Sequence, residues 1–82
     1  MGIILKIVSP EKIEFDGEVE RVNVPGSKGN FEILQNHAPI ISSLQQGTVE
    51  YIGKTGLKTV DIIGGFVEVL NNEVSLCVEK LQ

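Results

Sequence analysis

Residues 64–79 read GGFVEVLNNEVSLCVE, and they give the clearest indication of how the chain folds. After the Asn-Asn pair at 71–72, every second residue is apolar, so Val74, Leu76 and Val78 would share one face of an extended segment. Asparagine tolerates the left-handed backbone of a two-residue turn. We therefore expect an antiparallel β-hairpin whose core side is formed by every second residue.

The same pattern extends from this hairpin toward the N-terminus. Short alternating segments are closed by Gly, Pro or Asn, including Asp16-Gly17, and Gly64-Gly65 permits a bulge or a corner. The expected strands are 3–8, 12–15, 18–24, 29–34, 38–44, 48–52, 57–63, 66–70 and 74–78. Roughly nine to ten short strands at this spacing predict an all-β fold, an antiparallel β-sandwich or flattened barrel. One domain should cover residues 1–82.

Composition excludes several classes of function. The net charge is -4, and the seven basic residues are scattered, so no nucleic-acid partner is expected. One cysteine and one histidine cannot complete a four-ligand metal site, and a lone Cys77 fits a reducing compartment. No apolar run approaches the roughly 20 residues that span a bilayer, so no transmembrane segment is expected.

Two motifs are similar to chemically active sites, but their spacing and neighbours do not support either activity. Gly53-Lys54-Thr55 is similar to the tail of a phosphate-binding loop, but Thr48 stands where the first glycine is required and 57–63 has strand periodicity. No nucleotide or other cofactor is therefore expected. His37 is the only histidine and so the only imidazole that could act as a general base, yet no nucleophile stands at a triad-like spacing. We expect His37 to hold a loop or touch a partner, and the chain to be non-catalytic.

Several motifs in the right order carry a resemblance to a known family. They are Val-x-Val-Pro-Gly-x-x-Gly-x-Phe at 22–31, Ile-Leu-x-x-His-Ala-Pro-Ile-Ile at 33–41, Gly47, and Gly-Gly-Phe-Val-Glu-Val-x-x-Asn-x-Val at 64–74. In this order they resemble the N-terminal β domain of the epsilon subunit of the rotary ATP synthase. The similarity runs in register through nearly the whole chain.

The resemblance implies a non-catalytic rotor subunit of the central stalk. Such a subunit joins the gamma subunit to the membrane c ring during proton- or sodium-coupled ATP synthesis, at the cytoplasmic face of the bacterial plasma membrane. By position in the family's motifs, the residues implied to face gamma are Ser9, His37 and Ser42. Those implied to face the c ring are Ser27, Lys28 and Asn30.

The chain also departs from the family's pattern. Asn30 and Lys28 stand where family members commonly carry acids, which weakens the case for a charge-paired contact with the c ring. Most members continue beyond the position of Gln82 into a pair of helices that carry a brake on ATP hydrolysis and, in some members, ATP binding. Neither role is expected of these residues.

Two other functions stay open at the level of sequence. A lipoyl- or biotinyl-type carrier domain has a similar size and a lysine at a hairpin tip, which here could only be Lys54. Its neighbours Gly53 and Thr55 are not the acidic or methionine residues that such carriers share. The second alternative is a β interaction module unconnected with energy coupling.

Overall fold

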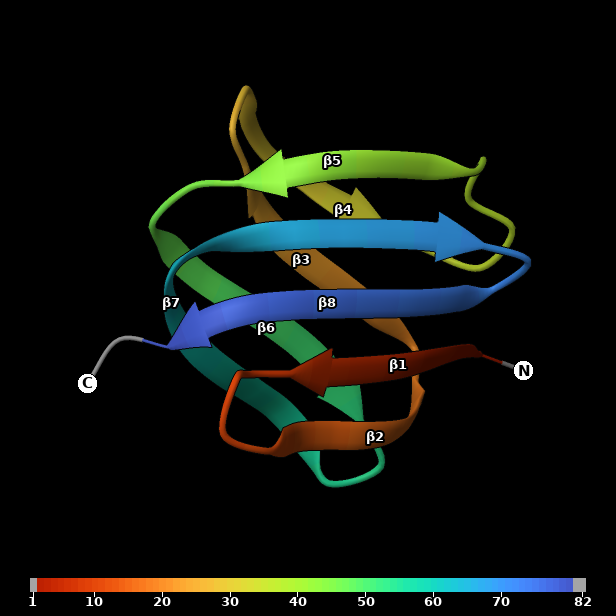
Figure 1. Cartoon of the computed structure of the whole chain (residues 1–82). Helices are drawn as coiled ribbons and strands as arrows, with labels where there is room; N and C mark the ends of the chain where they lie inside the picture. The colour runs from red at the N-terminus through yellow and green to blue at the C-terminus, as the bar shows by residue number, and fades with distance from the viewer. Residues whose placement is uncertain (1, 81–82) are drawn as a thin grey trace.

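The computed structural model describes residues 2–80 as eight β-strands (Figure 1). The strands are β1 (Ile3–Val8), β2 (Ile13–Val19), β3 (Arg21–Gly26), β4 (Gly29–Ile33), β5 (Ile40–Leu44), β6 (Gly47–Gly53), β7 (Gly56–Leu70) and β8 (Glu73–Lys80). The all-β, sandwich-like fold expected from the sequence is confirmed.

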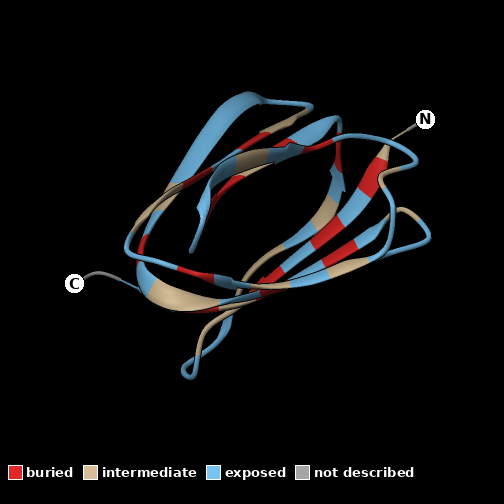
Figure 2. Ribbon diagram, turned by 90° about the horizontal axis from the view of Figure 1, so that it is seen from above, coloured by how far each residue is buried: buried red, intermediate tan, exposed pale blue. Residues whose placement is uncertain are grey.

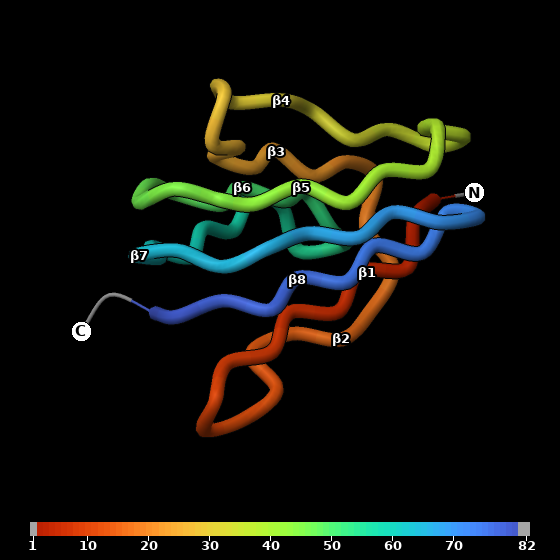
Figure 3. The backbone as a smooth tube through the Cα atoms, turned by 45° about the horizontal axis from the view of Figure 1, so that its top comes forward, coloured from red at the N-terminus to blue at the C-terminus, as the bar shows by residue number. Residues whose placement is uncertain are grey.

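The strands form two packed layers that share β7 (Figures 1 and 3). The front layer has the order β2-β1-β8-β7-β5, and the rear layer contains β4, β3, β6 and the first part of β7. Residues 56–62 of β7 pair with β6, whereas residues 65–69 pair with both β5 and β8. All pairings are antiparallel except that of β1 with β8, which run in the same direction.

A glycine makes the passage of β7 between the layers possible. The register with β8 shifts between Ile62 and Gly64, and Gly65 has a φ of 146°. A Cβ atom at Gly65 would also collide with the carbonyl oxygen of Cys77. Only glycine combines this backbone conformation with so close a neighbouring strand. Gly64-Gly65 was expected to permit a bulge or a corner, and the irregularity in register lies directly before this pair, between Ile62 and Gly64.

The strand count and one turn differ from the expectation. β7 is a single strand rather than two, because the bulge bends it without ending it. Asp16-Gly17 makes no turn; these residues lie within β2 and pair with Lys6 and Leu5 of β1. Asp-Gly closes a hairpin only when its two flanks pair with each other, and here both flanks pair with β1 instead. The chain reverses before β2, at residues 9–12.

The interior is formed almost entirely by aliphatic side chains, which alternate with exposed ones along the strands (Figure 2). The predicted core face of the last hairpin is confirmed, since Val74, Leu76 and Val78 are buried. Each such side chain contributes about 1.5–3 kcal/mol by leaving water. No polar or charged residue is buried among residues 2–80. The buried hydrophobic core is Ile3, Leu5, Ile7, Val19, Val22, Val24, Ile33, Leu44, Val49, Tyr51, Ile62, Val67, Val69, Val74, Leu76 and Val78.

Substitution of Gly65 by alanine tests the passage of β7. The substitution G65A should lower the free energy of unfolding by about 1–3 kcal/mol from backbone strain alone, and the clash with Cys77 should add to this loss. G29A is the matched control, because Gly29 has a φ of 126° but no atom within 4 Å of an added Cβ. Urea unfolding curves would measure both variants, and equal losses would show that the close approach of Cys77 does not matter.

Candidate functional site

The outer surface of the front layer carries a continuous apolar row. Cross-strand pairing aligns Ser43 with Phe66, Phe66 with Cys77, Cys77 with Val8, and Val8 with Ile13. Phe66 and Ile13 are about half exposed, at 48% and 55%. The four residues Phe66, Cys77, Val8 and Ile13, here named the apolar row, cross β7, β8, β1 and β2, and Ser43 of β5 ends the line with a polar side chain. A sheet that faced only water would carry polar residues at these positions.

A shallow hollow of about 430 Å³ lies along this row. Its lining includes Val8, Phe66 and Cys77 from the row, together with Ser9 and Pro10 from the turn that follows β1. The same layer exposes further apolar side chains elsewhere: Ile4, Ile41 and Leu70. These side chains add apolar area to the front layer, which also exposes the charged Lys6 and Glu68.

The outer surface of the rear layer is more polar. A salt bridge joins Arg21 of β3 to Glu32 of β4, with 3.4 Å between nitrogen and oxygen. Asn23 and Glu50 are paired neighbours beside it on β3 and β6. Exposed ion pairs of this kind contribute little stability but keep a surface hydrated. The two faces of the sandwich therefore differ in chemistry.

Ser9 is held in a small polar network at one end of the front layer. Its hydroxyl donates to Glu14 Oε2 at 2.9 Å, and Lys80 Nζ donates to Glu14 Oε1 at 3.1 Å. The hydrogen bond from Lys80 is the main cause that lowers the pKa of Glu14 below its ordinary value of 4.5, while burial opposes the shift and Ser9 adds to it. The turn with Ser9 is thus tied to the end of β8.

His37 lies in the loop between β4 and β5. Its Nδ1 is 2.7 Å from the carbonyl oxygen of Ala38, and because a carbonyl only accepts, Nδ1 carries the hydrogen. Its backbone N–H donates to the carbonyl of Leu34 at 3.1 Å. The ring centroid lies 6.4 Å from that of Phe31. These contacts hold the loop in shape and leave Nε2 of the ring for another partner.

The three residues predicted to face the c ring lie together on the β3–β4 hairpin. Ser27, Lys28 and Asn30 line a hollow of about 570 Å³ that β5 completes on its other side. Ser27 binds β5 twice: its N–H donates to the carbonyl of Ser43 at 3.0 Å, and the two hydroxyl oxygens are 2.8 Å apart. Ser42 also lines this hollow.

The structure divides the three residues predicted to face gamma. β1 and β8 are parallel, and β7 is antiparallel to both β8 and β5, so β1 and β5 run in one direction. Ser9 follows the end of β1 and His37 precedes the start of β5, which places them at opposite ends of the front layer. Ser42 lies instead beside the β3–β4 hairpin. The apolar row lies between these positions and was not recognised from the sequence.

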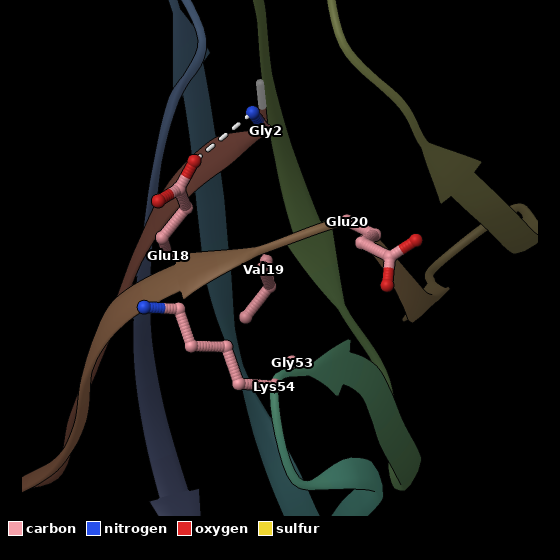
Figure 4. Close-up of a pocket in the computed structure, with 6 residues that line it drawn as sticks. All are labelled: Gly2, Glu18, Val19, Glu20, Gly53 and Lys54. Carbon is pink, nitrogen blue, oxygen red and sulfur yellow. Dashed lines mark hydrogen bonds between the residues drawn. The ribbon is translucent and has the colours of Figure 1, made fainter.

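Lys54 is at the tip of the β6–β7 hairpin, where Gly53 pairs with Gly56. Figure 4 shows its side chain extending toward β2, beside a hollow of about 340 Å³ that Glu18 and Gly2 also line. Glu18 accepts a hydrogen bond from the N–H of Gly2 at 3.1 Å (Figure 4). The predicted hairpin is confirmed, and a strand rather than a helix follows the Gly-Lys-Thr sequence.

Within residues 2–80, no three His, Cys, Asp or Glu side chains converge as a metal site would require. The same part of the chain has no helix of the length and apolarity that would cross a membrane.

Comparison with known proteins gives the family. The family model described as "ATP synthase, Delta/Epsilon chain, beta-sandwich domain" matches residues 3–82. The chain belongs to this family. The resemblance found in the sequence motifs is thereby confirmed, and the alternative of a lipoyl- or biotinyl-type carrier receives no support.

Among relatives in the delta/epsilon family is the ATP synthase epsilon chain of Leptospira borgpetersenii serovar Hardjo-bovis (strain JB197). It is 46% identical over 72 residues, which make up 88% of this chain and 57% of that protein. The ATP synthase epsilon chain of Desulfatibacillum aliphaticivorans is 40% identical in an alignment of 82 positions that covers 99% of this chain and 58% of that protein. The chain therefore spans less than two thirds of the length of these relatives.

Solved structures from the ATP synthase share the fold. A chain of the Euglena gracilis mitochondrial ATP synthase, in a structure of OSCP/F1/c-ring, superposes with a TM-score of 0.87 at 21% identity over 94% of this chain and 50% of its own. A chain from the central stalk/c-ring of the Tetrahymena thermophila mitochondrial ATP synthase gives a TM-score of 0.82 at 15% identity, over 98% of this chain and 65% of its own. The fold is thus shared although few residues are identical.

The network around Glu14 predicts how the stability of this delta/epsilon domain depends on acid. Because the folded chain lowers the pKa of Glu14, the stabilisation is fully present above pH 4.5 and is lost as the pH falls through the folded pKa. As the pH falls from about 5 to about 3, the unfolding temperature of E14Q should therefore decrease less than that of the unmodified chain. Thermal melts across this range would measure the difference.

E73Q is the control for this measurement. Glu73 is exposed at the start of β8 and forms none of the salt bridges found among residues 2–80. Its variant should keep the acid sensitivity of the unmodified chain. If the unfolding temperatures of E14Q and the unmodified chain fell equally with pH, Glu14 would have no role in the acid sensitivity.

Proposed function

We propose that this chain acts as a non-catalytic rotor subunit of a bacterial ATP synthase, linking the gamma subunit to the c ring. The family match over residues 3–82 carries the proposal, and the central-stalk origin of a fold neighbour agrees with it. The chain lies, in this proposal, at the cytoplasmic face of the plasma membrane as a peripheral subunit. Its role in ATP synthesis driven by a proton or sodium gradient is to transmit rotation through surface contacts.

The apolar row is proposed as the centre of the contact with gamma. A standard interface buries about 1,600 Å², or about 800 Å² on each partner, and the whole surface of the chain measures 5081 Å². A five-stranded layer that exposes about half of Phe66 on β7 supplies such an area. Large aromatic side chains near the centre of an interface carry much of the binding energy. Ser9 borders this area, which supports its assignment to gamma.

The β3–β4 hairpin is proposed as the contact with the c ring. Its tip carries Ser27, Lys28 and Asn30, all exposed. These residues offer hydrogen bonds and one positive charge but no carboxylate. The contact would therefore depend on hydrogen bonds more than on ion pairs, and added salt should weaken it little.

His37 and Ser42 are proposed to touch gamma from two further sides of the front layer. The Nε2 atom of His37 is available for a hydrogen bond, because Nδ1 already binds Ala38. Ser42 uses its hydroxyl to donate to the carbonyl of Ser43 at 3.1 Å and can still accept a bond from a partner. Both assignments rest on the family's pattern together with these free acceptors.

A capture experiment tests the proposal. The tagged chain is used to capture partners from detergent-solubilised membranes of its source organism, and bound subunits are identified by mass spectrometry. The unmodified chain should recover gamma and c subunits. F66E should lower the recovery of gamma at least tenfold, since a carboxylate would be buried without a partner at the centre of the interface.

T59E is the matched control, because Thr59 is an exposed β7 residue that pairs with Glu50 on the outer surface of the rear layer. It should recover gamma as the unmodified chain does. Failure of the folded, unmodified chain to recover either subunit would overturn the proposed function. If F66E and T59E lowered the recovery of gamma equally, the placement of gamma on the front layer would be overturned.

A further inference from the structure

Two asparagines distant in sequence bind each other reciprocally. The backbone N–H of Asn36 donates to Oδ1 of Asn72 at 2.6 Å, and Nδ2 of Asn72 donates to Oδ1 of Asn36 at 3.3 Å. Asn36 belongs to the β4–β5 loop, and Asn72 belongs to the turn between β7 and β8. We name this pair the asparagine clamp. It connects the loop that carries His37 to the end of the front layer.

The backbone at both positions suits this arrangement. Asn36 has a φ of 68° and Asn72 a φ of 63°, in the left-handed region that asparagine occupies more readily than other residues with side chains. The carbonyl of Asn72 also accepts a hydrogen bond from the N–H of Ile4 at 2.9 Å. The turn is thus anchored to β1, and Asn72 is a fixed point against which the loop can rest.

The clamp is the counterpart of contacts at the other end of β5. There, Gly26 pairs with Leu44, and the N–H of Ser27 donates to the carbonyl of Ser43. These backbone bonds fasten the rear layer to β5 near its C-terminal end. At the N-terminal end of β5, the hydrogen bonds found between the β4–β5 loop and the front layer come from the asparagine clamp. The position of His37 therefore depends on side-chain bonds.

We propose that Asn72 is a positioning residue for the docking of gamma, holding the β4–β5 loop so that His37 is presented in one place. This inference rests on the proposed function. Docking to a fixed loop avoids the free-energy cost of ordering that loop on binding. Without the clamp, the loop would sample several positions and the affinity for gamma would fall.

The substitution N72G removes the side chain that forms the clamp and still allows the backbone conformation of the turn. Glycine adopts a positive φ without strain, so the β7–β8 hairpin should persist. N71G is the matched control, since Asn71 has a φ of 51° in the same turn, and its side chain makes none of the hydrogen bonds found among residues 2–80. Any general effect of adding glycine to the turn should be equal in the two variants.

Two measurements are made on each variant. Amide hydrogen exchange by NMR reports the N–H of Asn36, and titration with purified gamma subunit reports affinity. N72G should exchange the Asn36 N–H at least tenfold faster and bind gamma several-fold more weakly, whereas N71G should change neither. N72D keeps an oxygen that accepts from the Asn36 N–H but has no Nδ2 donor, so it should recover most of the protection of that amide.

The outcomes separate the inference from the function on which it rests. If the unmodified chain fails to bind gamma, the proposed function is wrong, whatever the exchange rates are. If it binds gamma and N72G binds equally well despite rapid exchange at Asn36, the clamp stabilises the loop without positioning it for docking, and the inference is overturned. Unchanged exchange at Asn36 in N72G would overturn it as well.

Discussion

The fold depends on one strand serving two layers. β7 pairs with β6 in the rear layer and then with β5 and β8 in the front layer, and it passes between them at Gly65. The passage needs a residue with a φ of 146° and no Cβ, because the carbonyl of Cys77 occupies the space where that atom would lie. Every other pairing in the front layer takes its register, directly or through a neighbour, from this strand.

Once the layers are closed, the alternation of side chains determines what lies outside. The inward positions are filled by aliphatic residues, so a residue such as Phe66 on the other side of β7 has no interior to enter. In a free-standing domain these outward positions would be polar. Here cross-strand pairing collects apolar residues into one row, while an ion pair and polar groups occupy the rear layer. An apolar face of this kind suits a protein that works inside an assembly.

The sequence was sufficient for the all-β class and for the family, because both rest on local or ordered signals. Period-two alternation predicted the core positions of β8, and the Asn-Asn and Gly-x-x-Gly turns were found where expected. The predicted turn at Asp16-Gly17 was wrong, because a dipeptide does not show which strand its flanking residues pair with. The apolar row and the asparagine clamp could not be predicted, since both join residues far apart in sequence through a register that only the folded sheet defines.

The parallel pairing of β1 with β8 has a mechanical consequence. Because the two strands run in the same direction, the start of β1 and the end of β8 lie at opposite ends of the front layer (Figure 1). Tension applied between those two points runs along the strands, so the backbone hydrogen bonds across the register from Ile4–Glu73 to Val8–Cys77 share the load in shear. Bonds loaded together in this way must break nearly at once, whereas those of a peeled hairpin break one after another. The order of the strands thus gives a small domain a direction in which it resists being pulled apart.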